Sequence, residues 1–380
     1  MLAFFDELIP LYPVYALLFA DAGLSGGQIS ALFALWSAVT FALEIPSGAL
    51  ADRMSRRQLI AAAALLRAVG FALWLSWPSF VGFALGFLLW GANSALVSGA
   101  WEALVYDELA ALGASGRYAR TIGRAEVAGA TGVLAGTALA APLIAVGGYP
   151  AAGWASVALC GAGAALALTL PDRPAAASAD GAGLAGYLRT LRAGVSEAAR
   201  RRVVRRALLA AALLAAFTAV EEYLPLLTEG MDLAPAVVPL LLLVPALATA
   251  VGAELAGRAE RIAPRQAAAL VAAAAAVFAA GVLWHHPAGF VGIALGYGGV
   301  WCVSLVAGAR LQDTIAGPRA TVTSVAGFGT ETTSLAFFAL VGAGSGVVAL
   351  PMLVAAMTLP VLLVAAVLPR WLPPAEPGDH

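Results

Sequence analysis

The sequence predicts an all-α membrane protein with twelve transmembrane helices, arranged as two pseudo-symmetric six-helix bundles. Of its 380 residues, 62% are hydrophobic and only 11% are charged, and the mean hydropathy is +0.90. A soluble domain usually carries about 25% charged residues. Apolar stretches of roughly the 20 residues that cross a bilayer recur along the whole chain. The basic residues fall into alternate connections between these stretches, which is the pattern of a multi-pass topology.

Apolar runs separated by turn-forming residues define the individual spans. Helices are the expected form, because an open sheet edge cannot face lipid. Breakers such as Trp77-Pro78, Gly147-Gly148 and His286-Pro287 mark the connections. The predicted spans are residues 2–20, 29–51, 58–77, 81–106, 122–146, 150–170, 207–228, 234–257, 266–284, 288–311, 320–341 and 347–368.

The basic residues set the direction of the spans. All 21 are arginines, and they gather after the even-numbered spans and in the long central connection. Only Arg67 falls deep inside a span, because Arg124 and Arg310 lie within two residues of a span end. Because positive charge marks the cytoplasmic side, we expect both termini in the cytoplasm. The arginine- and alanine-rich composition is typical of a GC-rich bacterial genome, so the expected location is the bacterial inner membrane.

The central connection divides the chain into four predicted parts. These are an N-terminal six-helix bundle (1–170), a cytoplasmic linker (171–206), a C-terminal six-helix bundle (207–368) and a cytoplasmic tail (369–380). The basic stretch 187–206 has two open interpretations. It is either a helix lying on the anionic inner leaflet or a solvated linker with positive-inside charge.

Two short matches at one offset, near 205 residues, indicate that the halves are duplicated. Residues 49–53 with Arg56 match residues 254–258 with Arg261, and Val97-Ser98 leading to Asp107 matches Val303-Ser304 leading to Asp313. Many secondary transporters are built from such repeats around a binding site at mid-membrane.

The connection between spans two and three carries a family motif. The stretch Gly48-Ala49-Leu50-Ala51-Asp52-Arg53-Met54-Ser55-Arg56-Arg57 resembles the signature of the major facilitator superfamily: Gly, three residues, Asp, a basic residue, then Gly and two basic residues. Ser55 replaces the second Gly, and in the second half Gly257 stands where the Asp would be. The span count and topology agree, so the resemblance covers the whole chain. The stretch 98–107 is similar to a bacterial branch of this superfamily with mostly unassigned substrates.

The resemblance implies a secondary transporter that works by alternating access. It also implies that Asp52, Arg56 and Asp107 form a charge cluster that clamps the cytoplasmic side in the outward-facing state. The same conformational-switch motif includes Gly48, Arg53, Arg57 and Glu44, which shares a helical face with Gly48 and Asp52. The alternative, that these arginines only set the topology, stays open.

Ionisable side chains inside the membrane are expensive and usually face a cavity or a partner. By resemblance, spans one, four, seven and ten line the cavity, which makes Asp6, Glu102 and Glu222 the best-placed acids. For Arg67 we expect a structural ion pair, with Glu44 as the suggested partner. The candidates for binding substrate or proton are Asp6, Glu102, Glu222, Glu331, Glu221, Glu126 and Asn93; a purely structural role is the alternative for each.

Several intramembrane acids against one arginine favour proton-coupled efflux of a cationic or neutral small organic molecule. In span five, Gly123, Gly132 and Gly136 follow the start of the superfamily's antiporter motif, but Thr137 replaces its Pro. Phe87 stands where drug antiporters usually carry an Arg. Uptake or facilitated diffusion of a metabolite, and a non-transporting membrane sensor, remain the alternatives.

The sequence lacks the motifs of a membrane-embedded enzyme. It contains no phosphate-binding loop, no GxSxG and no His-rich metal set. We therefore predict no enzymatic activity, no cofactor and no resident metal. The expected partners are a small-molecule substrate, the proton and membrane lipid, without nucleic acid, and the expected state is a monomer.

Overall fold

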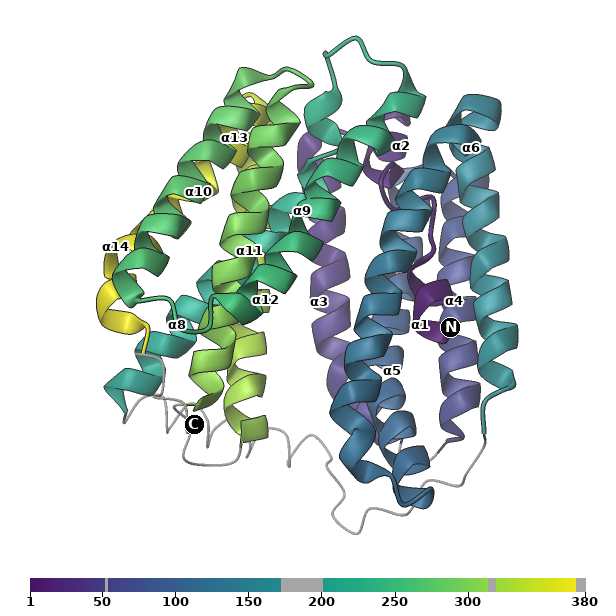
Figure 1. The fold of residues 1–380 in the computed structure, drawn as a ribbon. Helices are drawn as coiled ribbons and strands as arrows, with labels where there is room; N and C mark the ends of the chain where they lie inside the picture. Colours follow the sequence, from purple (N-terminus) through teal and green to yellow (C-terminus); the bar gives the residue numbers. More distant parts are fainter. Residues whose placement is uncertain (52–53, 172–200, 314–318, 374–380) are drawn as a thin grey trace. The chain divides into compact units, whose positions relative to one another are not determined.

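The computed structural model describes residues 1–51, 54–171, 201–313 and 319–373. These residues form helices and connecting turns, without a strand in the described ranges (Figure 1). The chain divides into two compact units. The first comprises Met1–Tyr187 and Leu233–Leu240, and the second comprises Leu188–Asp232 and Leu241–His380.

The first unit contains the first six predicted spans. Span one consists of two short helices, and spans five and six form one long element with an internal break. The helices are α1 (Leu2–Glu7), α2 (Tyr15–Asp21), α3 (Gly26–Ala51), α4 (Arg56–Ser76), α5 (Phe80–Ala111) and α6 (Tyr118–Leu168), with a 3-10 turn η1 (Ser115–Arg117) before α6.

The break in α6 lies at the predicted boundary between spans five and six. The helix has 51 residues, roughly 75 Å at 1.5 Å per residue, which is far more than one crossing of about 30 Å needs. Gly147 and Gly148 leave the helical conformation, and Gly148 has φ 61° and ψ −158°. An L-residue with a side chain is strained in this region, so a glycine is required at the turn. The predicted breaker is confirmed.

The second unit contains the remaining predicted spans, except for the start of span eight, since Leu233–Leu240 belongs to the first unit. Span seven is α8 (Arg202–Ala216) continued by the 3-10 segments η2 (Phe217–Tyr223) and η3 (Leu226–Thr228), and span twelve is α13 (Leu350–Ala356) with α14 (Thr358–Trp371). The others are α9 (Val238–Arg258), preceded by η4 (Pro235–Val237), α10 (Pro264–Trp284), α11 (Gly289–Asp313) and α12 (Arg319–Gly344). In the described ranges, nine helical segments are long and apolar enough to cross a membrane, and α6 counts once among them.

Parts of three predicted regions lie outside the described residues. They are most of the linker (172–200), most of the tail (374–380), and Asp52 and Arg53 of the family motif. Where the chain is described again, α8 starts at Arg202 rather than at the predicted residue 207, and α14 extends to Trp371 rather than 368.

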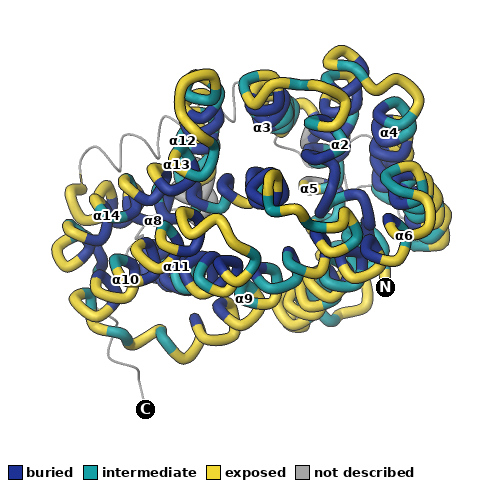
Figure 2. Tube along the Cα trace, turned by 90° about the horizontal axis from the view of Figure 1, so that it is seen from above, coloured by how far each residue is buried: buried dark blue, intermediate teal, exposed yellow. Residues whose placement is uncertain are grey.

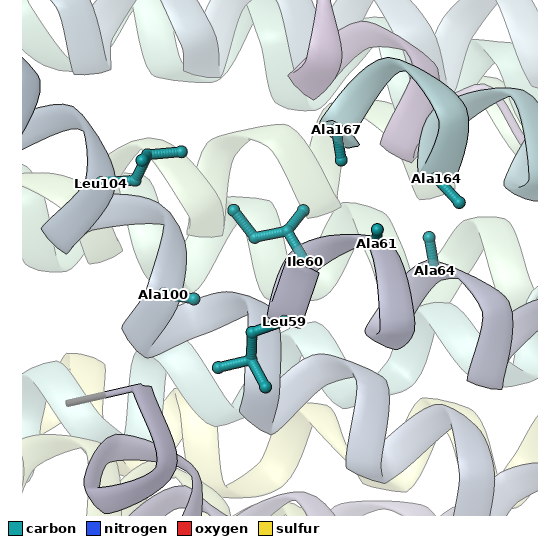
Figure 3. Packing of buried hydrophobic residues seen from close by; sticks show 8 residues of the cluster. All are labelled: Leu59, Ile60, Ala61, Ala64, Ala100, Leu104, Ala164 and Ala167. Carbon is teal, nitrogen blue, oxygen red and sulfur yellow. The ribbon is translucent and has the colours of Figure 1, made fainter. Parts of the chain in front are cut away.

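Two kinds of packing hold the first unit together. Small residues let α4, α5 and the second half of α6 approach closely, as Figure 3 shows for Leu59, Ile60, Ala61, Ala64, Ala100, Leu104, Ala164 and Ala167. Elsewhere large rings pack together in an aromatic cluster, defined as Tyr12, Tyr15, Phe19, Phe33, Trp36, Phe71, Trp74, Phe83, Phe87 and Trp90. Buried and exposed stretches alternate along the helices (Figure 2), as expected where one face packs on other helices and another faces lipid.

Candidate functional site

Span one is interrupted in its middle. α1 ends at Glu7, α2 begins at Tyr15, and Pro10 and Pro13 lie between them. A proline lacks the backbone N–H and clashes with the preceding turn, so a helix does not run through it. The predicted continuous span 2–20 is therefore wrong in its central part. Non-helical backbone at membrane depth is tolerated where protein covers it, and it often marks the binding region of a secondary transporter.

The second half of α6 supports this interruption. The backbone N–H of Leu11 donates to Ser156 Oγ at 3.0 Å, and the Ser156 hydroxyl donates to the carbonyl of Ala152 at 2.8 Å. Both Leu11 and Ser156 are fully buried. A donor freed by the prolines is thus satisfied by a side chain from another span, which fixes the position of the break.

A buried arginine joins the two sides of the break. Arg67 on α4 is 3% exposed, and its Nη2 donates to Asp6 Oδ1 at 2.5 Å and to the Asp6 carbonyl at 2.9 Å. Its Nη1 donates to the Tyr12 hydroxyl at 3.0 Å. The ion-pair partner of Arg67 is therefore Asp6, and the suggested pairing with Glu44 is wrong. A buried ion pair is tolerable only when such additional hydrogen bonds accompany it.

Tyr12 links this ion pair to the aromatic cluster. Its ring stacks on Trp90 of α5, with centroids 5.1 Å apart and planes 7° from parallel, and it meets Phe71 of α4 edge-on at 6.3 Å. Each such aromatic pair adds about 0.5–1.5 kcal/mol beyond area burial. A movement of the span-one break would therefore disturb both the ion pair and the packing of α4 and α5.

Glycines on α6 allow α1 to approach closely. A Cβ atom at Gly132 would lie 2.4 Å from the Phe4 carbonyl oxygen, and one at Gly136 would lie 2.8 Å from the Ile9 nitrogen. Only glycine leaves room for backbone at these distances. At Gly123, the first glycine of the antiporter-like spacing, a Cβ atom would meet no other atom within 4 Å. Two of the three motif glycines thus position span one.

A cavity of about 470 Å³ lies beside the ion pair, inside the first unit. Its charged lining residues are all acidic: Asp6 and Glu7 of α1 and Glu126 of α6. Trp101 of α5 supplies an aromatic ring, and the other lining residues are Leu2, Ala3, Ile60, Ala64, Val97, Ala125, Gly129, Ala130, Val133 and Gly163. The described lining is therefore a mostly apolar space with negative charge at one side.

Only some of the predicted candidates in this unit meet at the cavity. Asp6 and Glu126 line it, whereas Glu102 is exposed and absent from the described lining. Asn93 is 3% exposed and lies on α5 one helical turn before the lining residue Val97. The structural ion pair expected for Arg67 is confirmed, whereas its partner Asp6 and its hydrogen bond to Tyr12 were not expected from the sequence. Pro10 and Pro13 were the sequence feature from which the non-helical position of Tyr12 could have been predicted.

The candidates in the second unit make contacts within that unit. The Tyr297 hydroxyl on α11 donates to Glu221 Oε2 at 2.9 Å, while Glu222 is half-buried in the same 3-10 segment, η2. Such a segment within a span often marks a hinge. Glu331 is half-buried on α12, and its neighbours Thr330 and Thr332 donate to carbonyls of their own helix.

The described part of the conformational-switch motif forms contacts within the first unit. Arg56 at the start of α4 pairs with Asp107 near the end of α5. Arg57 Nη1 donates to the carbonyls of Leu168 and Leu170, at 3.4 and 3.3 Å, where α6 ends. Glu44 and Gly48 lie on α3. Glu44 is exposed, and its carbonyl accepts from the Ser47 hydroxyl at 2.8 Å.

A second buried arginine performs a similar task in the other unit. Arg310 on α11 is 4% exposed. It donates to the carbonyls of Glu260 at 2.7 Å, Ile262 at 2.6 Å and Pro373 at 3.0 Å. It therefore ties the connection between α9 and α10 to the residues that follow α14.

Several helices long enough to cross a membrane, an interrupted first span and a buried ion pair are features found in polytopic secondary transporters. The chain belongs to the Major Facilitator Superfamily, because the model of that family matches residues 1–331. The twelve-helix architecture predicted from the sequence is that of this fold.

Three solved structures illustrate the likeness. A mutant of the nucleoside transporter NupG is 14% identical, with 97% of each chain covered and a TM-score of 0.77. A bacterial homologue of the human lysosomal transporter Spinster is 17% identical, with 96% and 93% covered and a TM-score of 0.70. A D-xylose–proton symporter is 15% identical, with 99% and 96% covered and a TM-score of 0.66. At these identities the likeness concerns the fold. Comparison with curated proteins gives no match.

Proposed function

We propose that this secondary transporter is a proton-coupled exporter of small cationic or neutral organic molecules. The observation that carries the proposal is the Asp6–Arg67 ion pair at the interruption of span one, next to a cavity whose charged lining is acidic. Ionisable side chains at membrane depth often mark substrate pathways and proton relays in transporters. Asp6 is therefore the residue that we expect to exchange the proton.

The proton step acts on the geometry of span one. When Asp6 binds a proton, its carboxyl group loses the negative charge that faces the Arg67 guanidinium. Arg67 then keeps the Tyr12 hydroxyl and the Asp6 carbonyl as acceptors. The attraction across the break weakens, and the equilibrium between two arrangements of span one shifts by the difference in pairing energy. Release of the proton restores the ion pair.

The charge of the cavity favours cations over anions. Low-dielectric walls concentrate the field of Glu126 and its neighbouring acids, so an organic cation gains more than a neutral molecule does. The Trp101 ring adds a face on which a cationic group can rest. An anion would meet like charge along the described lining.

The structural neighbours include transporters of different kinds, so the direction of transport is the point to be tested. Their printed names include a nucleoside transporter and a D-xylose–proton symporter, so coupled uptake of a neutral metabolite is the second candidate. The excess of acids in the cavity, without a basic residue in its described lining, favours export of a cation. The two candidates predict opposite proton movements.

Everted membrane vesicles with an established proton gradient test the proposal. A pH-sensitive dye reports proton release when tetraphenylphosphonium, uridine, xylose or benzoate is added to vesicles containing the wild type, Asp6→Asn or Glu254→Gln. Glu254 is a suitable control because its side chain is 72% exposed and pairs with Arg258 on the same helix.

We expect proton release with the cation in the wild type and Glu254→Gln, and none with Asp6→Asn. Proton entry with uridine or xylose in right-side-out vesicles would establish uptake instead. Equal responses from Asp6→Asn and the wild type would refute the role of Asp6. Asp6→Asn is compared with the wild type only after gel filtration shows equal amounts of folded protein.

A further inference from the structure

Two buried N–H donors beside one tryptophan ring have no acceptor in the described part of the chain. They are Nδ2 of Asn93 on α5 and Nε1 of Trp36 on α3. Buried polar groups are nearly always hydrogen-bonded, so an exception requires an explanation. Two such exceptions around the same ring point to an acceptor that the described part of the chain does not supply.

Both donors lie close to Trp90. The rings of Trp36 and Trp90 are 5.1 Å apart, and Asn93 follows Trp90 by three residues, which places it on the same side of α5. The same face continues at steps of four to Val97 and Trp101, which line the cavity. The donors therefore lie where the cavity-facing stripe of α5 meets the aromatic cluster.

Neighbouring polar groups are committed to local bonds. The Thr40 hydroxyl donates to the Trp36 carbonyl at 3.0 Å, and the Ser94 hydroxyl donates to the Trp90 carbonyl at 3.2 Å. By contrast, Trp74 in the same cluster donates its Nε1 to the Phe83 carbonyl at 3.0 Å. The fold thus satisfies one buried indole and leaves another without an acceptor, at a depth where water is scarce.

We propose that the Asn93 amide N–H, with the Trp36 indole N–H as a second donor near Trp90, binds a hydrogen-bond acceptor of the transported molecule. The inference rests on the proposed function, because it takes the neighbouring cavity as the transport site. The acceptor is a carbonyl, ether or hydroxyl oxygen or a ring nitrogen. Together with the acidic lining, it defines a substrate with a positive or neutral group at one end and an acceptor at the other. A simple lipophilic cation would interact with the acidic lining but would leave the two N–H donors without an acceptor.

The first experiment measures thermal stability without any ligand. Asn93→Leu keeps the size of the side chain and removes a buried amide that has no partner, so the apparent melting temperature should rise by roughly 2–4 °C. Trp36→Phe and the matched variant Trp74→Phe both lose ring packing, and Trp74→Phe should lower the melting temperature further because a hydrogen bond is also lost. A lower melting temperature for Asn93→Leu would overturn the inference, since it would mean that the amide is already bonded in the empty protein.

The second experiment compares two probes of the same size. Acetylcholine carries an ester oxygen, and pentyltrimethylammonium has the same cationic group without an acceptor. We expect the wild type to bind acetylcholine about three- to ten-fold more tightly, measured as the ligand concentration that half-saturates thermal stabilisation. Asn93→Leu should bind the two probes equally.

The outcomes separate this inference from the proposed function. An unchanged preference for acetylcholine in Asn93→Leu would overturn the role of Asn93 while leaving cation transport intact. Failure of the wild type to bind or transport either cation would count against the proposed function. The ligand-free comparison of Asn93→Leu, Trp36→Phe and Trp74→Phe would still decide whether these donors are unpaired.

Discussion

Replacing Asp6 by asparagine keeps the shape of the side chain and removes the charge that faces Arg67. Arg67 is 3% exposed, so its charge would stay buried without a counter-ion. Breaking a fully buried pair in this way costs about 3–5 kcal/mol. Here the Tyr12 hydroxyl and the Asp6 carbonyl still accept from Arg67, and the Asp6 side chain is 27% exposed. We therefore expect a loss of about 2–3 kcal/mol.

A double-mutant cycle measures this coupling. Purified protein in detergent is unfolded by heat or by added denaturing detergent, for the wild type, Asp6→Asn, Arg67→Met and the double variant. The double variant should be more stable than Asp6→Asn alone, because it no longer buries an unpaired charge. Glu126→Gln is the control, with an expected change within about 0.5 kcal/mol, since Glu126 is exposed. Strictly additive losses in the cycle would refute the reasoning.

Three further substitutions test the packing, two of them beside this site and one in the second unit. Gly132→Ala places a Cβ atom 2.4 Å from the Phe4 carbonyl and should lower stability by about 1–3 kcal/mol; Gly123→Ala, which meets no atom within 4 Å, should not. Ser156→Ala removes the acceptor of a buried backbone N–H and should cost about 1–3 kcal/mol, with faster amide hydrogen exchange in the segment 8–14 by mass spectrometry. Arg310→Gln leaves carbonyls without a donor, and it should lower the melting temperature and make residues after α14 more accessible to protease; unchanged cleavage would contradict the tie described above.

The number and order of spans followed from local features of the sequence. Hydropathy, breakers and arginine placement are all read over short windows, and they located the turn at Gly147-Gly148 where the chain adopts a conformation specific to glycine. The one local feature that the span count passed over was the pair Pro10 and Pro13. Both prolines interrupt α-helical hydrogen bonding, so the break in span one could have been predicted from the sequence.

The Asp6–Arg67 ion pair could not be predicted from the sequence, because its partners are 61 residues apart in the chain. Glu44 was suggested as the partner of Arg67, but no local pattern in the sequence records which face of α1 meets α4. That face is set by the glycines of α6 and by the Ser156 bond to Leu11. Glu102 illustrates the same limit: it is one residue from Trp101 on α5, and a rotation of about 100° per residue carries it off the cavity-lining face.

The exclusive use of arginine has a structural consequence beyond the charge balance. Arg67 and Arg310 each make three hydrogen bonds to groups in different parts of the chain, and this depends on a planar fork of donors. A lysine offers a compact point charge on a flexible stem and loses its charge more readily when buried. Arg67 thus binds a carboxylate, a carbonyl and a hydroxyl at once, and Arg310 binds three carbonyls. In the first unit this geometry gives Arg67 two acceptors, the Tyr12 hydroxyl and the Asp6 carbonyl, in addition to the Asp6 carboxylate, so the arginine is held by more than the ion pair alone.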